Sequence, residues 1–166
     1  MDSAREMFEA DVASRSLGIE LVELAEGLAV VRMRVTAAMV NGHAIGHGGY
    51  VFLLADTAFA CACNTHGPVT VAAGASITFL APVAEGDLLT ARAQERVLFG
   101  RSGIYDVTVH RSDEIVAEFR GHSRTLARQK LPGGTPPGRH VGPGSTTTTG
   151  GRNLTNNVKE YRFVKT

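Results

Sequence analysis

One stretch of the chain, residues 50–64, constrains the fold more than any other. It is rich in Ala and Leu and apolar on nearly every side, so a helix formed by it must be enclosed by protein. Because Asp56 and Thr57 interrupt the run, it falls short of the roughly 18 to 20 uninterrupted apolar residues that cross a membrane. We therefore expect a central buried helix and no membrane partner.

Period-two alternation of apolar and polar residues predicts strands on both sides of this helix. In the clearest case, Val31 and Met33 share one face while Arg32 and Arg34 share the other. The expected strands span residues 17–24, 28–36, 69–80, 87–98, 103–110 and 115–126. Their connections are too short for parallel crossovers, so we expect an α+β domain whose antiparallel sheet wraps around the helix. Its uncovered edges and outer face predict self-association.

The amino-terminal residues predict a short amphipathic helix over residues 3–14 that covers an edge of the core. Ser3 and Glu6 have the spacing of a capping box. The first ten residues carry several charged side chains and lack the apolar segment of an export signal. We therefore expect no secretion.

Composition changes sharply near residue 131. The segment from there to the end holds four of the six prolines and seven of the 19 glycines, with few apolar residues. Such a segment buries too little apolar surface to offset the entropy lost on ordering. We expect one domain over residues 1–129 and a disordered tail over residues 130–166.

Charge and sequence motifs exclude several classes of function. The 17 Lys and Arg residues nearly balance the 16 Asp and Glu residues, and no basic run occurs, so we expect no nucleic-acid partner. The sequence contains no G-x-S-x-G elbow, Walker loop or dinucleotide fingerprint. A serine hydrolase and a nucleotide-binding enzyme are therefore disfavoured.

Cysteine and histidine spacing favours neither a disulfide nor a metal centre. Cys61 and Cys63 are too close for a framework disulfide and lie in an apolar stretch, which indicates core packing in a reducing compartment, the cytoplasm. His43 and His47 are four residues apart, but glycines surround them and no third ligand is evident nearby. We expect no metal.

Asp56 is the residue most at odds with its surroundings, since it is the charged residue in an otherwise apolar helix. An unpaired buried carboxylate costs several kcal/mol, so it must be hydrogen-bonded, paired, or in contact with a wet cavity. One interpretation is structural, a bond to backbone or to an arginine of a partner chain. The other is a functional carboxylate of the kind that general-base chemistry requires.

The glycine-rich loop over residues 41–49 leads directly into the helix. Glycines there let a ligand approach free backbone N–H groups, and the helix dipole favours negative charge at that point. The oxyanion that forms during acyl transfer would be stabilised there. The loop can also be a tight turn without further function.

These motifs together resemble those of the hot dog-fold thioesterases, within them most closely the PaaI-type phenylacetyl-CoA thioesterases. The resemblance extends over about residues 7–126 and leaves the tail uncovered. Its most specific parts are Asn41-Gly42-His43, His47-Gly48-Gly49 and, seven residues after that, Asp56. It implies a hot dog fold, in which an antiparallel sheet wraps a central helix, and homodimers or homotetramers with active sites between subunits.

The resemblance also implies roles for individual residues. The Gly48 N–H would polarise the thioester carbonyl, Gly49 would contact the substrate beside it, and Asn41 would hydrogen-bond near the reacting thioester or water. Asp56 would reach in from the other subunit as general base or nucleophile, and the sequence leaves both open. His47 would orient the loop.

Three further residues are candidates for substrate binding. Some relatives carry a Ser or Thr on the strand after the helix that helps hold the water, and Ser76 is the residue expected to do so here. Arg101 lies in a Gly-Arg-Ser-Gly turn and Arg124 on the last expected strand. Both could bind coenzyme A phosphates, or both could be solvated surface arginines.

The sequence therefore predicts an acyl-CoA thioesterase that acts on phenylacetyl- or hydroxyphenylacetyl-type thioesters, as in phenylacetate degradation, without a metal or redox cofactor. The alternatives are a hot dog module that binds acyl-CoA without turnover and a hydratase- or dehydratase-like relative. The dehydratase would use His43 or His47 together with Asp56 on one acyl chain. Release of thiol from a CoA thioester distinguishes the first function from the others.

Overall fold

The computed structural model describes residues 1–127, so the tail expected over residues 130–166 lies outside the described part of the chain. The helices are α1 (Asp2–Ala10), α2 (Val12–Ser16), the short 3₁₀ helix η1 (Ala37–Met39) and α3 (Gly48–Cys63). The strands are β1 (Glu20–Ala25), β2 (Leu28–Arg34), β3 (Thr70–Phe79), β4 (Leu88–Phe99), β5 (Ser102–Arg111) and β6 (Glu114–Thr125). Within residues 1–127, no helix combines the length and hydropathy that crossing a membrane requires.

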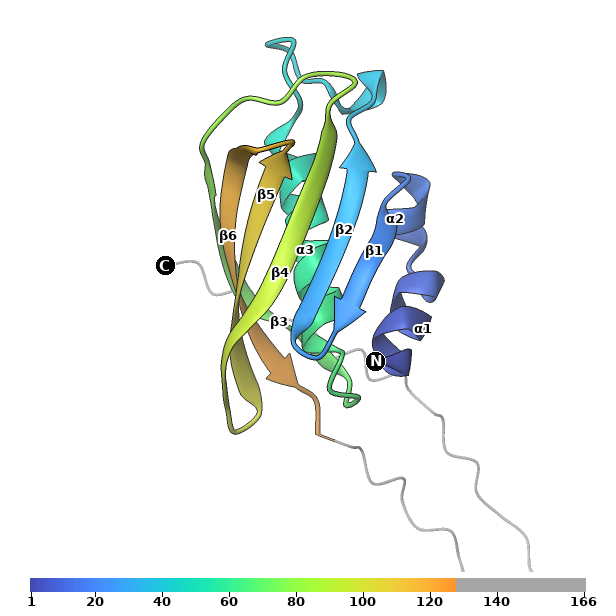
Figure 1. Ribbon diagram of the computed structural model, residues 1–166, viewed down its shortest axis with the longest axis vertical. Coiled ribbons are helices and arrows are strands. Elements are labelled where there is room, and N and C mark those ends of the chain that lie inside the picture. The colour runs from blue at the N-terminus through green and yellow to red at the C-terminus, as the bar shows by residue number, and fades with distance from the viewer. Residues whose placement is uncertain (128–166) are drawn as a thin grey trace, which may run out of the picture. The chain divides into compact units, whose positions relative to one another are not determined.

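The strands form one antiparallel sheet that curls around α3 (Figure 1). Their order is β1-β2-β4-β5-β6-β3, and every neighbouring pair is antiparallel. The first strand begins three residues later than expected because Gly18, at φ +67°, closes a turn after α2. The expected α+β architecture, a hot dog fold, is confirmed.

The core lies between the concave face of the sheet and α3. Leu54, Ala58 and Phe59 of α3 are almost completely buried, as are the inward residues of β5, such as Tyr105 and Val107. The rings of Phe59 and Tyr105 meet edge to face with centroids 5.5 Å apart. Most sides of α3 are therefore buried, as a helix without a polar face requires.

The amino-terminal segment forms two helices, and the expected capping box is wrong. The first helix begins at Asp2 without a side-chain cap, and the Ser3 hydroxyl donates instead to the backbone oxygen of Asn64 at 2.9 Å. Asp11 divides the segment, because its carboxylate accepts from the Ser14 N–H at 3.1 Å and caps α2. A long-range contact to the end of α3 has replaced the local bond that spacing indicated.

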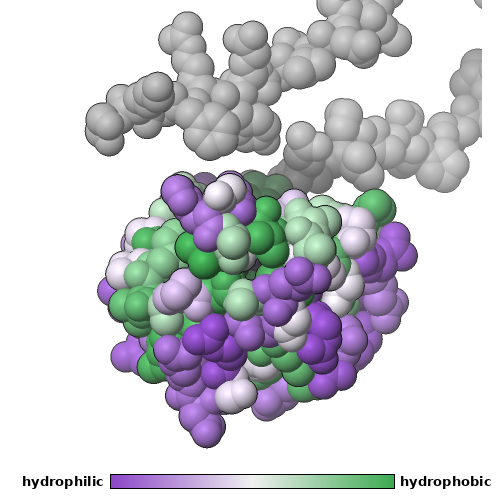
Figure 2. All heavy atoms as spheres, turned by 90° about the horizontal axis from the view of Figure 1, so that it is seen from above, coloured by the Kyte–Doolittle hydropathy of each residue, from purple (hydrophilic) through white to green (hydrophobic). Residues whose placement is uncertain are grey.

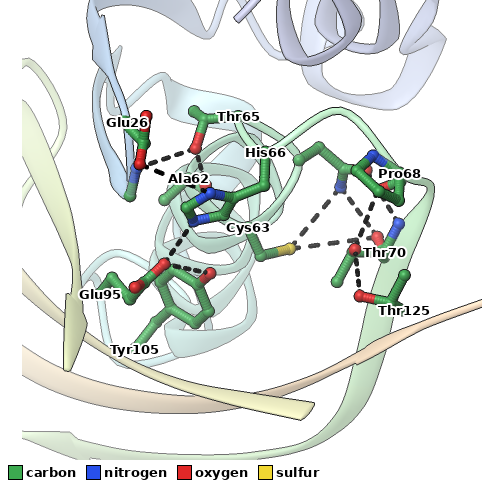
Figure 3. Close-up of polar contacts among 12 residues, drawn as sticks. Glu26, Ala62, Cys63, Thr65, His66, Pro68, Thr70, Glu95, Tyr105 and Thr125 are labelled. Atoms are coloured by element: carbon green, nitrogen blue, oxygen red, sulfur yellow. Dashed lines mark hydrogen bonds and ion pairs between the residues drawn. The ribbon is translucent and has the colours of Figure 1, made fainter. Parts of the chain in front are cut away.

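Polar contacts fix the carboxyl end of α3 against the sheet (Figure 3). The Asn64 side-chain amide donates to the Thr70 carbonyl oxygen at 2.8 Å and its oxygen accepts from the Thr70 N–H at 3.0 Å. His66 lies 2.5 Å from a Glu95 carboxylate oxygen, which also accepts from the Tyr105 hydroxyl at 2.9 Å. These contacts set where β3 begins relative to α3.

Strand β3 is the one large element left uncovered within the described residues. It pairs only with β6, so its other edge carries unpaired backbone groups, and most of its side chains are exposed. Phe79, its last residue, is 52% exposed. Exposed strand edges of this length pair readily with another strand.

Gly121 of β6 gives a test of the packing between sheet and helix. A Cβ at this position would lie 2.8 Å from ring atoms of the buried Phe59, so Gly121→Ala should destabilise the fold by about 1–3 kcal/mol. Chemical denaturation measures the loss. Gly42→Ala is the matched control, because a Cβ there meets no atom within 4 Å, and its stability should be unchanged or slightly higher. Equal stability of the two variants would contradict this account of the core.

Candidate active site

A cavity of about 460 Å³ opens at the amino end of α3. At this end, the loop before α3 and the loop between β3 and β4 lie side by side (Figure 1). Figure 2 looks onto the same end and shows hydrophobic side chains, in green, among the polar ones. The cavity is lined by Asn41, Ile45, Gly46, Gly48, Val51, Phe79, Leu80, Ala81, Pro82, Val83 and Val116. An apolar lining with a few polar groups is typical of small-molecule sites.

Gly48 brings a free hydrogen-bond donor to this cavity. His47 caps the helix, since its Nδ1 accepts from the Gly49 N–H at 2.9 Å and its carbonyl oxygen accepts from the Tyr50 N–H at 3.0 Å. The Gly48 N–H between them has no hydrogen-bond acceptor within residues 1–127. It lies at the positive end of a 16-residue helix, where an oxyanion is stabilised.

Asn41 holds the loop that precedes the helix and also lines the cavity. Its side-chain oxygen accepts from the backbone N–H groups of His43 at 2.8 Å and Ile45 at 3.4 Å. Its own N–H donates to the Ile45 carbonyl oxygen at 2.8 Å. Since no acceptor within residues 1–127 engages the side-chain NH₂, that group is free to donate to a ligand.

Asp56 lies partly buried on α3, and within the chain it does not line this cavity. Burial raises the pKa of its carboxyl, and the negative charge of Asp11 raises it further. No hydrogen bond or ion pair to the Asp56 carboxylate occurs within the described 127 residues. A single chain therefore holds the carboxylate and the free N–H at separate places.

The remaining residues expected near the loop lie elsewhere within the chain. His47 and Gly49 line a shallow hollow of about 300 Å³ with Tyr50 and Leu53, on the side of α3 away from the cavity lining. His43 is exposed and lines neither hollow. A histidine facing the cavity, as a dehydratase would use, is not present among the lining residues.

Ser76 lies on the outer face of the sheet, away from α3. It is directly opposite Arg120 in the register of β3 and β6, and it lines a polar hollow of about 270 Å³ with Asp106 and Glu118. Residues opposite one another in an antiparallel pair share a face, and Arg120 faces solvent. Within one chain the sheet therefore separates Ser76 from Asp56, and the role expected for Ser76 stays a prediction.

Arg101 and Arg124 lie together at the opposite end of the sheet. Arg101 lines a small hollow of about 70 Å³ near the carboxyl end of α3, and Arg124 donates to the Ser102 hydroxyl at 3.2 Å. Helix α3, about 24 Å long for 16 residues at about 1.5 Å each, runs between this end and Gly48 of the same chain.

Sequence reasoning missed the wall of the cavity formed by residues 79–83. Phe79 packs directly on Gly48, since its ring would lie 2.9 Å from a Cβ at that glycine. Alternation predicts a strand that ends at Leu80 and a plain connection over residues 81–86, without a functional role for either. The available signal was the apolar character of these residues, which is unusual for a surface connection.

The described residues offer neither a metal site nor a reactive thiol. No group of three or more His, Cys, Asp or Glu side chains within residues 1–127 is arranged to hold a metal ion. Both cysteines are free and buried, and burial raises the pKa of each thiol to about 12. Neither can serve as a thiolate nucleophile near neutral pH.

Comparisons with known proteins point to one family. Residues 43–118 match the model of the Thioesterase superfamily. The chain is 47% identical to the acyl-coenzyme A thioesterase PaaI of Escherichia coli K12, over 75% of this chain and 89% of the relative. It is 35% identical to a putative esterase of Archaeoglobus fulgidus, over 69% of this chain and 75% of that one.

Comparison with solved structures points to the same family. The E. coli PaaI protein from the phenylacetic acid degradation operon matches with a TM-score of 0.74 and 46% identity, over 76% of this chain and 92% of that chain. A point mutant of the phenylacetic acid degradation protein PaaI from Thermus thermophilus matches with a TM-score of 0.68 and 38% identity, over 70% and 100% of the two chains.

The environment of Asp56 predicts a gain of stability when its charge is removed. A carboxyl whose pKa is raised by folding stabilises the fold below its unfolded pKa, near 3.8, and loses that contribution as the pH rises through the folded pKa. Asp56→Asn resembles the protonated form, so the variant should be more stable than wild type at pH 7, with a smaller difference at pH 4. Denaturant unfolding at both pH values measures this. A variant less stable than wild type at pH 7 would contradict it.

Proposed function

We propose a substrate and a mechanism for this chain, which belongs to the thioesterase superfamily and is an acyl-CoA thioesterase of the PaaI type. The proposed substrates are phenylacetyl- or hydroxyphenylacetyl-type CoA thioesters, which are hydrolysed to the free acid and coenzyme A in phenylacetate degradation. The observation that carries the proposal is the free Gly48 N–H in an apolar cavity of about 460 Å³. The operon of the E. coli relative supports the aryl-acetyl group.

In this mechanism the amino end of α3 stabilises the transition state. The thioester carbonyl oxygen accepts a hydrogen bond from the Gly48 N–H, and that bond strengthens as the oxygen gains negative charge. One such donor contributes on the order of 3 kcal/mol to catalysis. Asn41 hydrogen-bonds near the same carbonyl or the attacking water, while Gly49 and His47 keep the helix start in place.

In this mechanism the Asp56 carboxylate either activates the attacking water or attacks the thioester itself. As general base it accepts a proton from water, the water oxygen bonds to the carbonyl carbon, the C–S bond breaks, and the sulfur of coenzyme A takes the proton. As nucleophile its carboxylate oxygen would bond to the carbonyl carbon and expel the coenzyme A thiolate, which takes up a proton. Water would then hydrolyse the acyl-aspartyl anhydride to the free acid and restore the Asp56 carboxylate. A raised pKa suits either role, because it makes the carboxylate a stronger base.

A second copy of the chain completes the site, which supports a homodimer or a homotetramer built from dimers. The uncovered edge of β3 can pair with β3 of the partner about a two-fold axis, which makes the pair antiparallel. The start of each β3 then lies beside the end of the other. Asp56 of the partner subunit would reach the cavity that holds Gly48 and Asn41.

The same pairing accounts for the positions of Arg101 and Arg124. Both lie near the start of β3 and therefore, in the proposed dimer, beside the cavity of the partner subunit. There they could bind coenzyme A phosphates, which lie far along the ligand from the thioester. No role is proposed for Ser76 in this mechanism. We place the enzyme in the cytoplasm, in keeping with its two free thiols.

The first experiment follows thiol release. Wild-type protein should turn over phenylacetyl-CoA faster than acetyl-CoA, as measured with a thiol reagent. Asp56→Ala and Asp56→Asn should lower kcat by about 100-fold or more, a loss of roughly 2.7 kcal/mol in transition-state stabilisation. The oligomer should remain folded in both variants.

Two outcomes would contradict these proposals. Binding of several acyl-CoAs without thiol release would indicate a binding module or a hydratase-like reaction. Near-native turnover by Asp56→Asn would make Asp56 structural. Glu118→Gln, on the outer face of the sheet, serves as the control for loss of one carboxylate and should leave turnover unchanged.

The proposed contacts of Arg101 and Arg124 with coenzyme A phosphates predict that their loss changes KM and leaves kcat nearly unchanged. Arg101→Ala or Arg124→Ala should raise KM severalfold for the full coenzyme A thioester and leave KM for the pantetheine thioester unchanged. A remote charge contact is the same in ground and transition states, so kcat should change little. Arg32→Ala, which removes an exposed ion pair with Glu20, is the control. Equal effects on both substrates would remove the residue from the phosphate site.

A further inference from the structure

Residues 80–83 form a continuous wall of the cavity without belonging to a strand. Leu80, Ala81, Pro82 and Val83 all line the cavity between the end of β3 and the start of β4. The N–H groups of Leu80 and Ala81 donate to the Val116 carbonyl oxygen at 2.9 and 3.3 Å. Because this segment lacks the hydrogen bonds of a strand, other contacts must hold it in place for the cavity to keep its shape.

Arg111, the last residue of β5, fixes the far half of this wall. Its Nη1 donates to the Pro82 carbonyl oxygen at 3.0 Å and to Asp87 Oδ2 at 2.7 Å, and its Nη2 pairs with Glu114. The same Asp87 oxygen accepts from the Ala84 N–H at 2.8 Å. The Arg111 guanidinium thus links two points of the β3–β4 connection, Pro82 and Asp87, to the end of β5.

The charged groups of Asp87, Arg111 and Glu114 stabilise one another. The Ala84 N–H, and with it the guanidinium of Arg111, lowers the pKa of the Asp87 carboxyl. The Asp87 and Glu114 carboxylates in turn raise the pKa of Arg111. Asp87 and Arg111 are only 22% and 29% exposed, so water competes less for these bonds than at an open surface.

The wall is also joined to the loop that carries Asn41. The Gly46 N–H donates to the Val83 carbonyl oxygen at 2.7 Å. A Cβ on Gly46 would overlap Val83 Cγ2, so the loop and the wall are in tight contact. A displacement of Val83 must therefore shift the loop as well.

We propose that Arg111 is a positioning residue that sets the width of the cavity, and thereby its choice among acyl groups. It acts through Pro82 and Val83 on the wall, and through Gly46 on the loop that positions Asn41. The inference rests on the proposed function, since it concerns the selection of the acyl-CoA substrate. Arg111 itself does not line the cavity.

The test compares Arg111→Ala with wild type in two measurements. The ratio of kcat/KM for phenylacetyl-CoA to that for hexanoyl-CoA should fall by about fivefold or more, mainly through KM for phenylacetyl-CoA, because a wall that moves discriminates less between shapes. Hydrogen exchange at the Gly46 amide, followed by NMR, should become faster. A general loss of stability would leave the kcat/KM ratio unchanged. It would also not speed exchange at the Gly46 amide more than at other amides.

Arg120→Ala is the matched control. Arg120 makes two hydrogen bonds to Asp106, at 2.6 and 2.9 Å, on the outer face of the sheet. The substitution therefore removes a comparable charged pair without contact to the cavity wall. Its substrate ratio and its Gly46 exchange should equal those of wild type.

The outcomes separate this inference from the proposed function. A folded Arg111→Ala with unchanged ratio and unchanged exchange would overturn the role of Arg111. If that variant does not fold, Arg111→Lys decides, since one ammonium cannot hold Pro82 and both carboxylates, and faster Gly46 exchange is again expected. If wild type hydrolyses no acyl-CoA, the proposed function fails, and with it the role in selectivity, whatever the exchange data show.

Discussion

Burial of a helix that has no polar face is the constraint on which the rest of the structure depends. The sheet covers one side of α3 and the amino-terminal helices cover part of another. What remains is a partly exposed strip of α3 that includes Leu53 and Asp56. Within residues 1–127, nothing covers this strip of the central helix completely. The same helix also brings a free N–H to a cavity at its amino end.

The residues proposed for catalysis are distributed accordingly along α3 and the loop before it. Gly48 and Asn41 lie together because the loop and the helix start are local to one another, and both line one cavity. Asp56 lies two turns further along α3 and on another side of it, where burial raises the pKa of its carboxyl. In the proposed mechanism, the α3 helix of a second copy presents its carboxylate to this cavity, which is why an oligomer is proposed.

Polar contacts hold the carboxyl end of α3 against the sheet, and others hold the connection beside its amino end. At the carboxyl end, Asn64 binds Thr70 in both directions and fixes the start of β3. At the amino end, Arg111 and Asp87 hold the connection that forms the cavity wall. Between them lies a tightly packed interface in which Gly121 admits the ring of Phe59. Hydrogen bonds and close packing therefore hold the boundaries of the cavity although its wall is a loop.

The periodic elements and the unusual residues could be predicted without a structure. Five of the six strands lie within two residues of their expected bounds, because alternation reflects which face of a strand is buried. Asp56 and the glycines before α3 were also evident, because a charge in an apolar helix and a run of glycines are visible without a structure. Only the tertiary structure decided that Ser3 bonds Asn64 and that Ser76 faces away from Asp56. It also decided that Arg111 holds the cavity wall at Pro82, 29 residues away. Such contacts depend on how distant segments meet, and spacing along the chain records only local geometry.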